Sequence, residues 1–103
     1  RGNGLALPLS DFLYAESQKN CVDIYFLREG HVEHQQLRTT LTSVLADANE
    51  KSIFQCHRSF IVNLSNIRSA HGNSNGYQLT VGDEHHTVPV SRSYVKTLRS
   101  FVG

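Results

Sequence analysis

The chain has 103 residues, of which 39% are hydrophobic and 18% are charged, and its formal net charge is +1. This size and balance suit one soluble globular domain with a modest core and leave no room for a second domain. No apolar run approaches the roughly 18 to 20 residues that cross a bilayer, and the N-terminus lacks the long apolar segment of a secretory signal. We therefore expect a cytoplasmic domain. Because the sequence contains no Met, even at position 1, we also expect a piece of a longer protein.

The charges are unevenly distributed along the chain. Residues 1–50 carry four basic and seven acidic side chains, whereas residues 51–103 carry six basic and two acidic ones. The second half is therefore the part suited to a polyanionic partner. Many ordinary domains share such an asymmetry, so charge alone does not indicate a nucleic-acid binder.

The first part of the chain is typical of antiparallel strands. Residues 5–9 contain a proline and suit an edge strand or a lead-in. Alternating apolar side chains predict three further strands, at 11–17, 21–27 and 32–38. The loop at 18–20 separates the first two of these, and a turn at 28–31 that contains Gly30 joins the last two into a hairpin.

The hydrophobic period changes after Thr39 and Thr40. Apolar side chains then recur at i, i+3, i+4 and i+7, and they are Leu41, Val44, Leu45 and Ala48. This spacing predicts a short amphipathic helix, and a threonine before it can cap the free backbone N–H groups of its first turn. We therefore expect one helix packed on a sheet.

Residues 54–63, "FQCHRSFIVN", read as an extended segment with an unusual member. On a chain of period two, Phe54, Cys56, Phe60 and Val62 share one side, and Arg58 falls on that side between them. An unpaired charge is costly to bury, so Arg58 must find a partner or leave the core face. We expect the chain to bend or bulge near His57 and Arg58 so that the charge reaches outward.

The last part of the chain predicts a turn, a second hairpin and a helix. Residues 63–67 suit a turn or a single helical turn, and residues 67–70 suit a short extended stretch. Glycine and asparagine predict a loop at 71–76. Residues 77–81 and 85–90 are predicted to pair as a hairpin. Residues 91–103 are predicted to form a short helix with Ser91 as N-cap, with an apolar stripe of Tyr94, Val95, Leu98, Phe101 and Val102.

The sequence carries no recognisable catalytic or metal motif. It has six histidines and two cysteines, but Cys56-His57 and His85-His86 are adjacent pairs, and neighbouring side chains on a strand point to opposite faces. It lacks the Gly-x-Ser-x-Gly nucleophile elbow and the glycine patterns of phosphate and dinucleotide loops. We therefore expect neither an enzyme, nor a cofactor, nor a metal site.

Three segments resemble the LytTR family, the DNA-binding output domain of bacterial response regulators. "FQCHRSFIVNLSNI" is similar to that family's Phe-x-x-His-x-Ser-aromatic-aliphatic-Val-Asn stretch with a following Ile. "DFLYAESQKNCVDIYF" resembles its early strand, polar loop and second strand, and "HTVPVSRSYVKTL" resembles its closing Pro-Val-Ser-Arg motif and short helix. Order and spacing agree over essentially the whole chain, so we expect residues 1–103 to form one such domain.

The resemblance implies a fold and a function. The fold would be mainly β with two short helices, an elongated antiparallel arrangement of small sheets. The function would be sequence-specific binding of double-stranded DNA, with loops and strand ends entering the major groove. It further implies a dimer on repeated half-sites and a receiver or sensor domain upstream in the full-length chain.

The resemblance also implies roles for individual residues. The residues that match base-reading positions of the family are Asn20 or its neighbour Cys21, Arg58 and Arg92. The residues expected to hold phosphates are Lys19, His57, Ser91, Ser93, Lys96 and Arg99. Arg and Asn suit base reading because each can form two hydrogen bonds, to guanine and adenine respectively, whereas phosphate contacts fix the register of the protein on the duplex.

Simpler interpretations of these residues stay open at this point. Arg58 could pair with Glu16 or Asp83 on a sheet face, and His57 could brace the sheet. Asn63 is expected to close a turn through its side chain. Both cysteines suit buried small side chains, although a redox switch between them is a further hypothesis. The alternative function is a non-enzymatic, β-rich protein-interaction module with a basic face.

Overall fold

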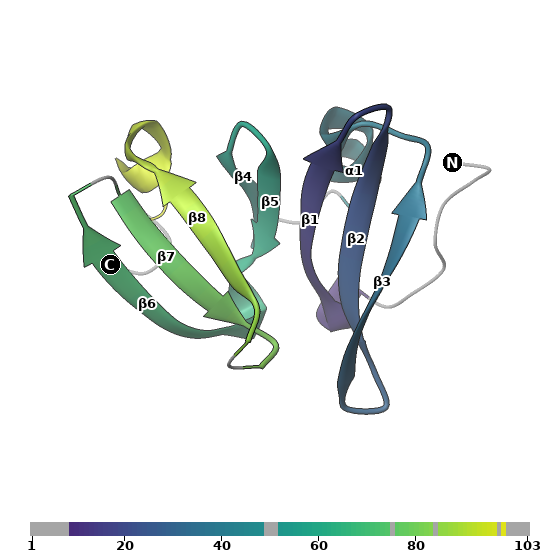
Figure 1. Cartoon of the computed structure of the whole chain (residues 1–103), viewed down its shortest axis with the longest axis horizontal. Coiled ribbons are helices and arrows are strands. Elements are labelled where there is room, and N and C mark those ends of the chain that lie inside the picture. The colour runs from purple at the N-terminus through teal and green to yellow at the C-terminus, as the bar shows by residue number, and fades with distance from the viewer. Residues whose placement is uncertain (1–8, 49–51, 75, 84, 97, 99–103) are drawn as a thin grey trace.

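Within the residues that the structure describes, the chain forms two antiparallel β-sheets and the helix α1 (Figure 1). The computed structural model describes residues 9–48, 52–74, 76–83, 85–96 and 98. The first sheet has five strands in the order β3-β2-β1-β5-β4, and the second has three in the order β6-β7-β8. The strands are β1 (Phe12–Gln18), β2 (Cys21–Arg28), β3 (His31–Leu37), β4 (Ile53–His57), β5 (Phe60–Asn63), β6 (Ile67–Asn73), β7 (Gly76–Val81) and β8 (Thr87–Ser91). The helical elements are α1 (Leu41–Ala48) and the 3-10 turns η1 (Leu9–Asp11), η2 (Leu64–Asn66) and η3 (Arg92–Tyr94).

This arrangement confirms the mainly β fold of small sheets. The domain measures 39 × 27 × 23 Å, so it is longer in one direction than in the other two. None of the helices in the described ranges has the length and hydrophobicity needed to span a bilayer.

The three strands predicted in the first part of the chain are confirmed as β1, β2 and β3. The turn between β2 and β3 uses Glu29 and Gly30, both with positive φ, at 52° and 81°. Residues 5–9 were predicted as an edge strand or a lead-in. Leu9 begins η1 and is not in a strand, and residues 5–8 lie outside the described residues.

Helix α1 begins with the predicted cap. The Thr40 Oγ1 accepts a hydrogen bond from the Ser43 backbone N–H at 3.1 Å, which satisfies one of the donors at the start of the helix. Leu41 is buried, and Val44, Leu45 and Ala48 are half-buried against the same core. The predicted apolar stripe therefore attaches α1 to the five-stranded sheet.

The five-stranded sheet lies between α1 and the three-stranded sheet, so it has a core on each face. The core beneath α1 contains Phe12, Ala15, Val22, Ile24, Phe26, Leu41, Ile53 and Ile61. The core between the sheets contains Leu13, Tyr14, Cys56, Val62, Leu79, Val81, Val88, Val90 and Leu98. Leu13 and Tyr14 are consecutive yet share a core because the register shifts between Phe12 and Tyr14, as at a β-bulge.

A group of aromatic rings joins the two sheets. The Tyr14 and Tyr25 rings stack with their centroids 4.3 Å apart and their planes 7° from parallel. His86, which follows β7 on the other sheet, lies against both rings, with centroid distances of 6.4 and 5.7 Å. Burial raises the pKa of the Tyr14 hydroxyl, and the neighbouring Tyr25 raises it further. These contacts attach the loop between β7 and β8 to the first sheet.

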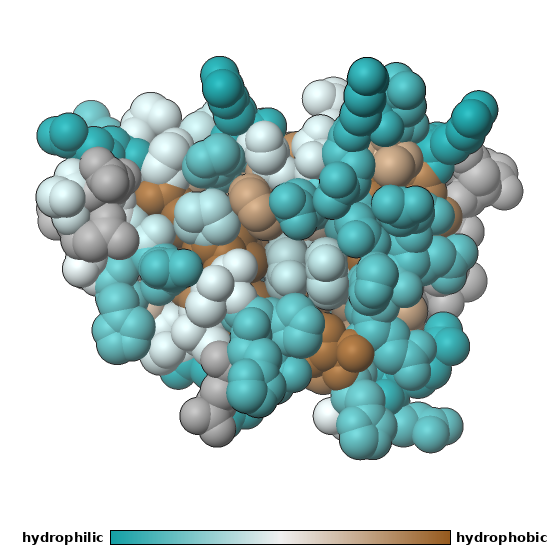
Figure 2. Space-filling model, viewed as in Figure 1, coloured by the Kyte–Doolittle hydropathy of each residue, from teal (hydrophilic) through white to brown (hydrophobic). Residues whose placement is uncertain are grey.

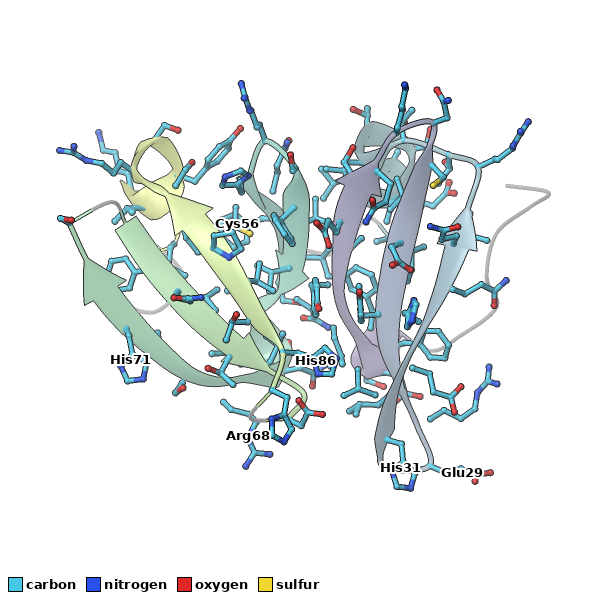
Figure 3. All side chains as sticks on the ribbon, in the orientation of Figure 1. Glu29, His31, Cys56, Arg68, His71 and His86 are labelled. Carbon is cyan, nitrogen blue, oxygen red and sulfur yellow. The ribbon has the colours of Figure 1, made fainter. Side chains whose placement is uncertain are left out.

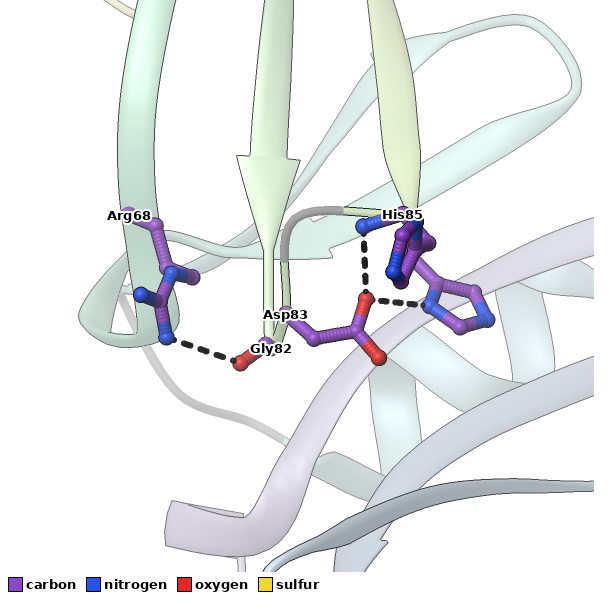
Figure 4. Close-up of polar contacts among 5 residues, drawn as sticks. Arg68, Gly82, Asp83 and His85 are labelled. Atoms are coloured by element: carbon purple, nitrogen blue, oxygen red, sulfur yellow. Dashed lines mark hydrogen bonds and ion pairs between the residues drawn. The ribbon is translucent and has the colours of Figure 1, made fainter.

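Polar contacts hold the same loop in shape (Figure 4). The Asp83 Oδ1 accepts hydrogen bonds from the His85 backbone N–H at 2.9 Å and from the His86 Nδ1 at 2.7 Å. These hydrogen bonds, above all that from His86, hold the pKa of Asp83 below its usual range. The Arg68 Nη1 reaches the Gly82 carbonyl oxygen at 3.5 Å, so β6 also contacts this loop.

The second sheet confirms the predicted hairpin and corrects the predicted loop at 71–76. Strand β6 continues to Asn73, and β7 already begins at Gly76, which pairs with Asn73. Gly72, Asn73 and Gly76 therefore lie in strands and not in a long loop. Gly76 makes this possible because it adopts φ +137°, a conformation that L side chains rarely adopt. The helical turn predicted at 63–67 is confirmed as η2.

The predicted C-terminal helix begins as the 3-10 turn η3. Ser91 occupies the N-cap position, but its side chain does not accept the expected hydrogen bond from a backbone N–H of η3, and its Oγ lies 3.3 Å from the Ser93 Oγ. Of the predicted apolar stripe, Tyr94, Val95 and Leu98 pack on the core between the sheets. Phe101 and Val102 lie outside the described residues.

Candidate nucleic-acid interface

Residues 54–63 form a hairpin and not one interrupted strand. Strand β4 ends at His57, a turn follows at Arg58 and Ser59, and β5 returns antiparallel beside β4. The register shifts between Gln55 and His57, so the irregularity expected near His57 is confirmed. The prediction that Arg58 shares a strand face with Cys56 and Phe60 is wrong, because the chain reverses direction at Arg58.

The side chains around this turn explain how it forms without glycine. The His57 Nδ1 accepts a hydrogen bond from the Ser59 backbone N–H at 3.1 Å, and the Gln55 Nε2 donates to the Arg58 carbonyl oxygen at 3.5 Å. The His57 ring also packs edge-on against Phe60, with centroids 5.6 Å apart. His57 therefore braces the sheet, as one interpretation of the sequence predicted. In a neutral ring whose Nδ1 accepts, the proton is on Nε2, which stays a donor.

Arg58 is exposed at the tip of the hairpin. Among the described residues, neither Glu16 nor Asp83 lies within the 4.0 Å that defines an ion pair with it. The expected pairing on a sheet face is therefore not found, and the guanidinium is presented to solvent.

The turn between β1 and β2 carries the next two candidates. Lys19 and Asn20 are both exposed, and Asn20 has a φ of 71°, in the left-handed region that Asn tolerates better than most residues. A hydrogen bond of 2.7 Å from the Ser17 N–H to the Ser59 carbonyl oxygen joins this turn to the β4–β5 turn. No residue pattern indicates this contact, because it joins backbone atoms.

The start of the C-terminal helical segment carries the third group. Arg92, Ser93 and Lys96 are exposed, and Ser91 is half-buried. Arg92 and Lys96 line an open hollow whose other wall includes Tyr77 and the glycines of the β6–β7 hairpin. This wall was not predicted, because the hairpin was read as a loop. Arg99 lies outside the described residues.

These three segments lie along one edge of the domain. Figure 1 shows the β1–β2 turn, the β4–β5 turn and the helical turn after β8 at the upper edge, and η3 contacts β4. In Figure 2, hydrophilic side chains project from this edge. Figure 3 shows Glu29, His31, Arg68 and His86 toward the opposite edge. The fold thus brings together candidates that are far apart in sequence, and the opposite edge carries carboxylates such as those of Glu29 and Asp83.

Asn63 links the hairpin to the rest of the fold. Its Oδ1 accepts from the Ser65 N–H at 3.0 Å, which confirms the predicted role in a turn. Its Nδ2 also donates to the Phe12 carbonyl oxygen at 3.0 Å, and the Asn66 Nδ2 donates to the same oxygen at 2.8 Å. These contacts span more than fifty residues of sequence, so no local pattern could have indicated them.

The two cysteines serve different parts of the first sheet. Cys56 is fully buried, and burial raises the pKa of its thiol to about 12. Cys21 is half-buried on β2, and β1 and β5 separate that strand from β4. At about 4.8 Å per strand the two backbones lie roughly 14 Å apart, beyond the roughly 7 Å that a disulfide can bridge. A disulfide switch between them does not fit this fold.

Comparison with known proteins identifies related sequences. Residues 3–103 match the family described as LytTr DNA-binding domain. The transcriptional regulatory protein YpdB of Escherichia coli K12 is 34% identical over 99 residues, which cover 95% of this chain and 39% of that protein. A response regulatory protein of Vibrio cholerae is 32% identical over 98 residues, covering 94% of this chain and 38% of that protein. The chain thus spans about two fifths of the length of these relatives.

A solved structure shares the fold. The LytTr DNA-binding domain of a response regulator from Bacillus cereus superposes with a TM-score of 0.80 at 25% sequence identity. The alignment covers 96% of this chain and 87% of that one.

Proposed function

Because this chain belongs to the LytTR DNA-binding domain family, we propose that it reads a specific DNA sequence in the major groove as the output domain of a bacterial transcriptional regulator. The observation that supports this most directly is the shared edge of the β1–β2 turn, the β4–β5 turn and the start of η3. A two-stranded β ribbon fits the major groove, which is about 12 Å wide.

Three exposed side chains on this edge are the proposed base readers. Arg58 and Arg92 can each donate two hydrogen bonds to the O6 and N7 of guanine, and Asn20 can pair in the same bidentate way with adenine. Each such contact contributes about 1 to 3 kcal/mol of discrimination against the wrong base. The backbone bond between Ser17 and Ser59 would hold Asn20 and Arg58 at a fixed separation.

The neighbouring polar side chains are the proposed phosphate ligands. They are Lys19, His57, Ser91, Ser93 and Lys96. Arg99 lies outside the described residues and is proposed from the resemblance alone. The His57 Nδ1 is occupied by the Ser59 N–H, so its Nε2 would be the atom that donates to a phosphate oxygen. Contacts of this kind set affinity and register without reading sequence.

The length of the relatives supports a larger assembly. YpdB extends well beyond the aligned part, so we propose that residues 1–103 are one domain of a longer chain with a receiver or sensor domain upstream. We further propose that the full-length protein binds repeated half-sites as a dimer.

Selection from random duplex DNA tests the function and yields the site at once. With the selected duplex in hand, Arg58→Ala and Arg92→Ala should each relax base preference at a different position, whereas Lys96→Ala should weaken binding to all sequences alike. Equal affinity of the unmutated domain for selected and random duplexes, at several salt concentrations, would show that it does not read sequence directly. No DNA binding at any salt concentration would instead favour the protein-interaction module.

A further inference from the structure

The DNA-facing edge continues past the β1–β2 turn to the end of β3. Leu37, the last residue of β3, pairs with Val22 at the start of β2, just after that turn. The next residue, Arg38, is exposed. Arg38 therefore lies at the same end of the sheet as Lys19 and Asn20, although it belongs to none of the three segments described above.

The order of the strands sets how far Arg38 extends this edge. Strand β3 is the outermost strand of the sheet, next to β2, and β1 and β5 follow. With neighbouring strands about 4.8 Å apart, the end of β3 lies roughly 7 Å to the side of the β1–β2 turn and roughly 17 Å from the β4–β5 turn. One base pair occupies about 3.4 Å of duplex, so 7 Å corresponds to about two base pairs.

The electrostatic surroundings favour an anion at this place. The β3–α1 connection places a cation beside the N-terminal end of α1, where the helix dipole adds positive potential. At the other end of the same strands, Glu29 lies in the β2–β3 turn and Arg28 forms an ion pair with Glu33 at 3.5 Å. The β2–β3 hairpin thus has a carboxylate in the turn at one end and an exposed arginine just beyond its other end.

We propose that Arg38 contacts a DNA phosphate about two base pairs outside the span reached by Asn20, Arg58 and Arg92. This inference rests on the proposed DNA binding and deepens it. The contact carries no sequence information, and it lengthens the DNA segment that the domain requires on the side of α1.

The test compares single substitutions on the selected duplex. One phosphate contact contributes about 0.9 to the slope of log K against log salt, so Arg38→Ala should lower that slope by about 0.9 and weaken binding about eightfold at 0.1 M salt. Base preference should stay unchanged, and Arg38→Lys should retain most of the affinity because it keeps the charge. Arg68→Ala is the matched control, since it removes the same side chain from an exposed position on the opposite edge (Figure 3).

Shortening the duplex gives a second readout. Removing three base pairs at the α1 end should weaken the unmutated domain by the same factor as Arg38→Ala, and Arg38→Ala should lose nothing further on the short duplex. The proposal falls if Arg38→Ala binds like the unmutated domain, or if the two losses add in full. If Arg58→Ala still relaxes base preference in that case, the proposed function stands and only the Arg38 contact is discarded. If no duplex is selected at all, both are discarded.

Discussion

Asn63 allows a direct test of how the fold holds the β4–β5 hairpin, which is proposed to face DNA. It is 2% exposed and makes two hydrogen bonds of 3.0 Å, from the Ser65 N–H and to the Phe12 carbonyl oxygen. Asn63→Ala removes an N-cap, which costs about 1 kcal/mol, and an amide hydrogen bond, which contributes about the same. We expect the free energy of unfolding to fall by about 2 kcal/mol.

Two further variants separate the causes of this loss. Asn63→Asp keeps the acceptor for the Ser65 N–H but places a buried carboxylate oxygen against the Phe12 carbonyl, so it should destabilise more than Asn63→Ala. Asn63→Ala combined with Asn66→Ala removes both amide donors from the Phe12 oxygen. The loss for the double variant should therefore exceed the sum of the single losses by about 1 kcal/mol.

Urea unfolding followed by circular dichroism measures these differences, and the chain has no Trp to serve as a fluorescence probe. Equal slopes with denaturant across the variants would show that the midpoints can be compared directly. If Asn63→Asp is as stable as the unmutated domain, the hydrogen bond from Asn63 to the Phe12 oxygen contributes nothing. If the two alanine substitutions are additive, the two amides do not share the Phe12 oxygen.

Three further predictions follow from burial and backbone geometry. A thiol reagent at pH 8 should modify half-buried Cys21 in the native domain and reach Cys56 only in urea; rapid native reaction at both would contradict the burial that raises the pKa of the Cys56 thiol to about 12. Because the folded pKa of Tyr14 is raised, its contribution to stability is complete below pH 10 and is lost at higher pH. Burial also raises the pKa of Tyr25, so alkaline absorbance titration of native protein should show a late step from these two tyrosines. Tyr14→Phe should reduce that late step by one tyrosinate. Gly76→Ala should lower the free energy of unfolding by about 3 kcal/mol or more, because its Cβ would lie 2.1 Å from a β8 carbonyl oxygen. Gly30→Ala is the control: its Cβ meets no atom within 4 Å, so it should cost about 1 to 2 kcal/mol. Similar losses in thermal unfolding of the two variants would contradict the contact at Gly76.

The elements with a clear hydrophobic period could be predicted from the sequence. Strands β1 to β3 and helix α1 follow alternation or the i, i+3, i+4 stripe, and the Thr40 cap was expected from its place before the stripe. The three segments proposed to face DNA were identified only through the resemblance to a family. Alternation alone indicated no more than that Arg58 needed a partner or a way out of the core.

The β4–β5 hairpin could not be predicted from local patterns. Its turn contains no glycine, proline, asparagine or aspartate, and the ring nitrogen of His57 supplies the acceptor that stabilises the turn. A glycine and asparagine run suggested a loop at 71–76 where strands pair almost to the end. In both places side-chain contacts and tertiary packing outweigh the residue preferences on which turn prediction depends.

The division of the proposed base readers between two sheets has a consequence for the proposed operator. Asn20 and Arg58 lie in turns of the same sheet, and the Ser17–Ser59 hydrogen bond holds those two turns at a fixed separation. Arg92 follows β8 of the other sheet, and the position of that sheet depends on the core between the sheets and on the His86 contacts with the tyrosine stack. If one base pair is inserted between the positions proposed for Asn20 and Arg58, the domain cannot move these two side chains apart to match it. An insertion before the position proposed for Arg92 can be absorbed only by repacking that core, so operator variants should tolerate spacing changes on that side alone.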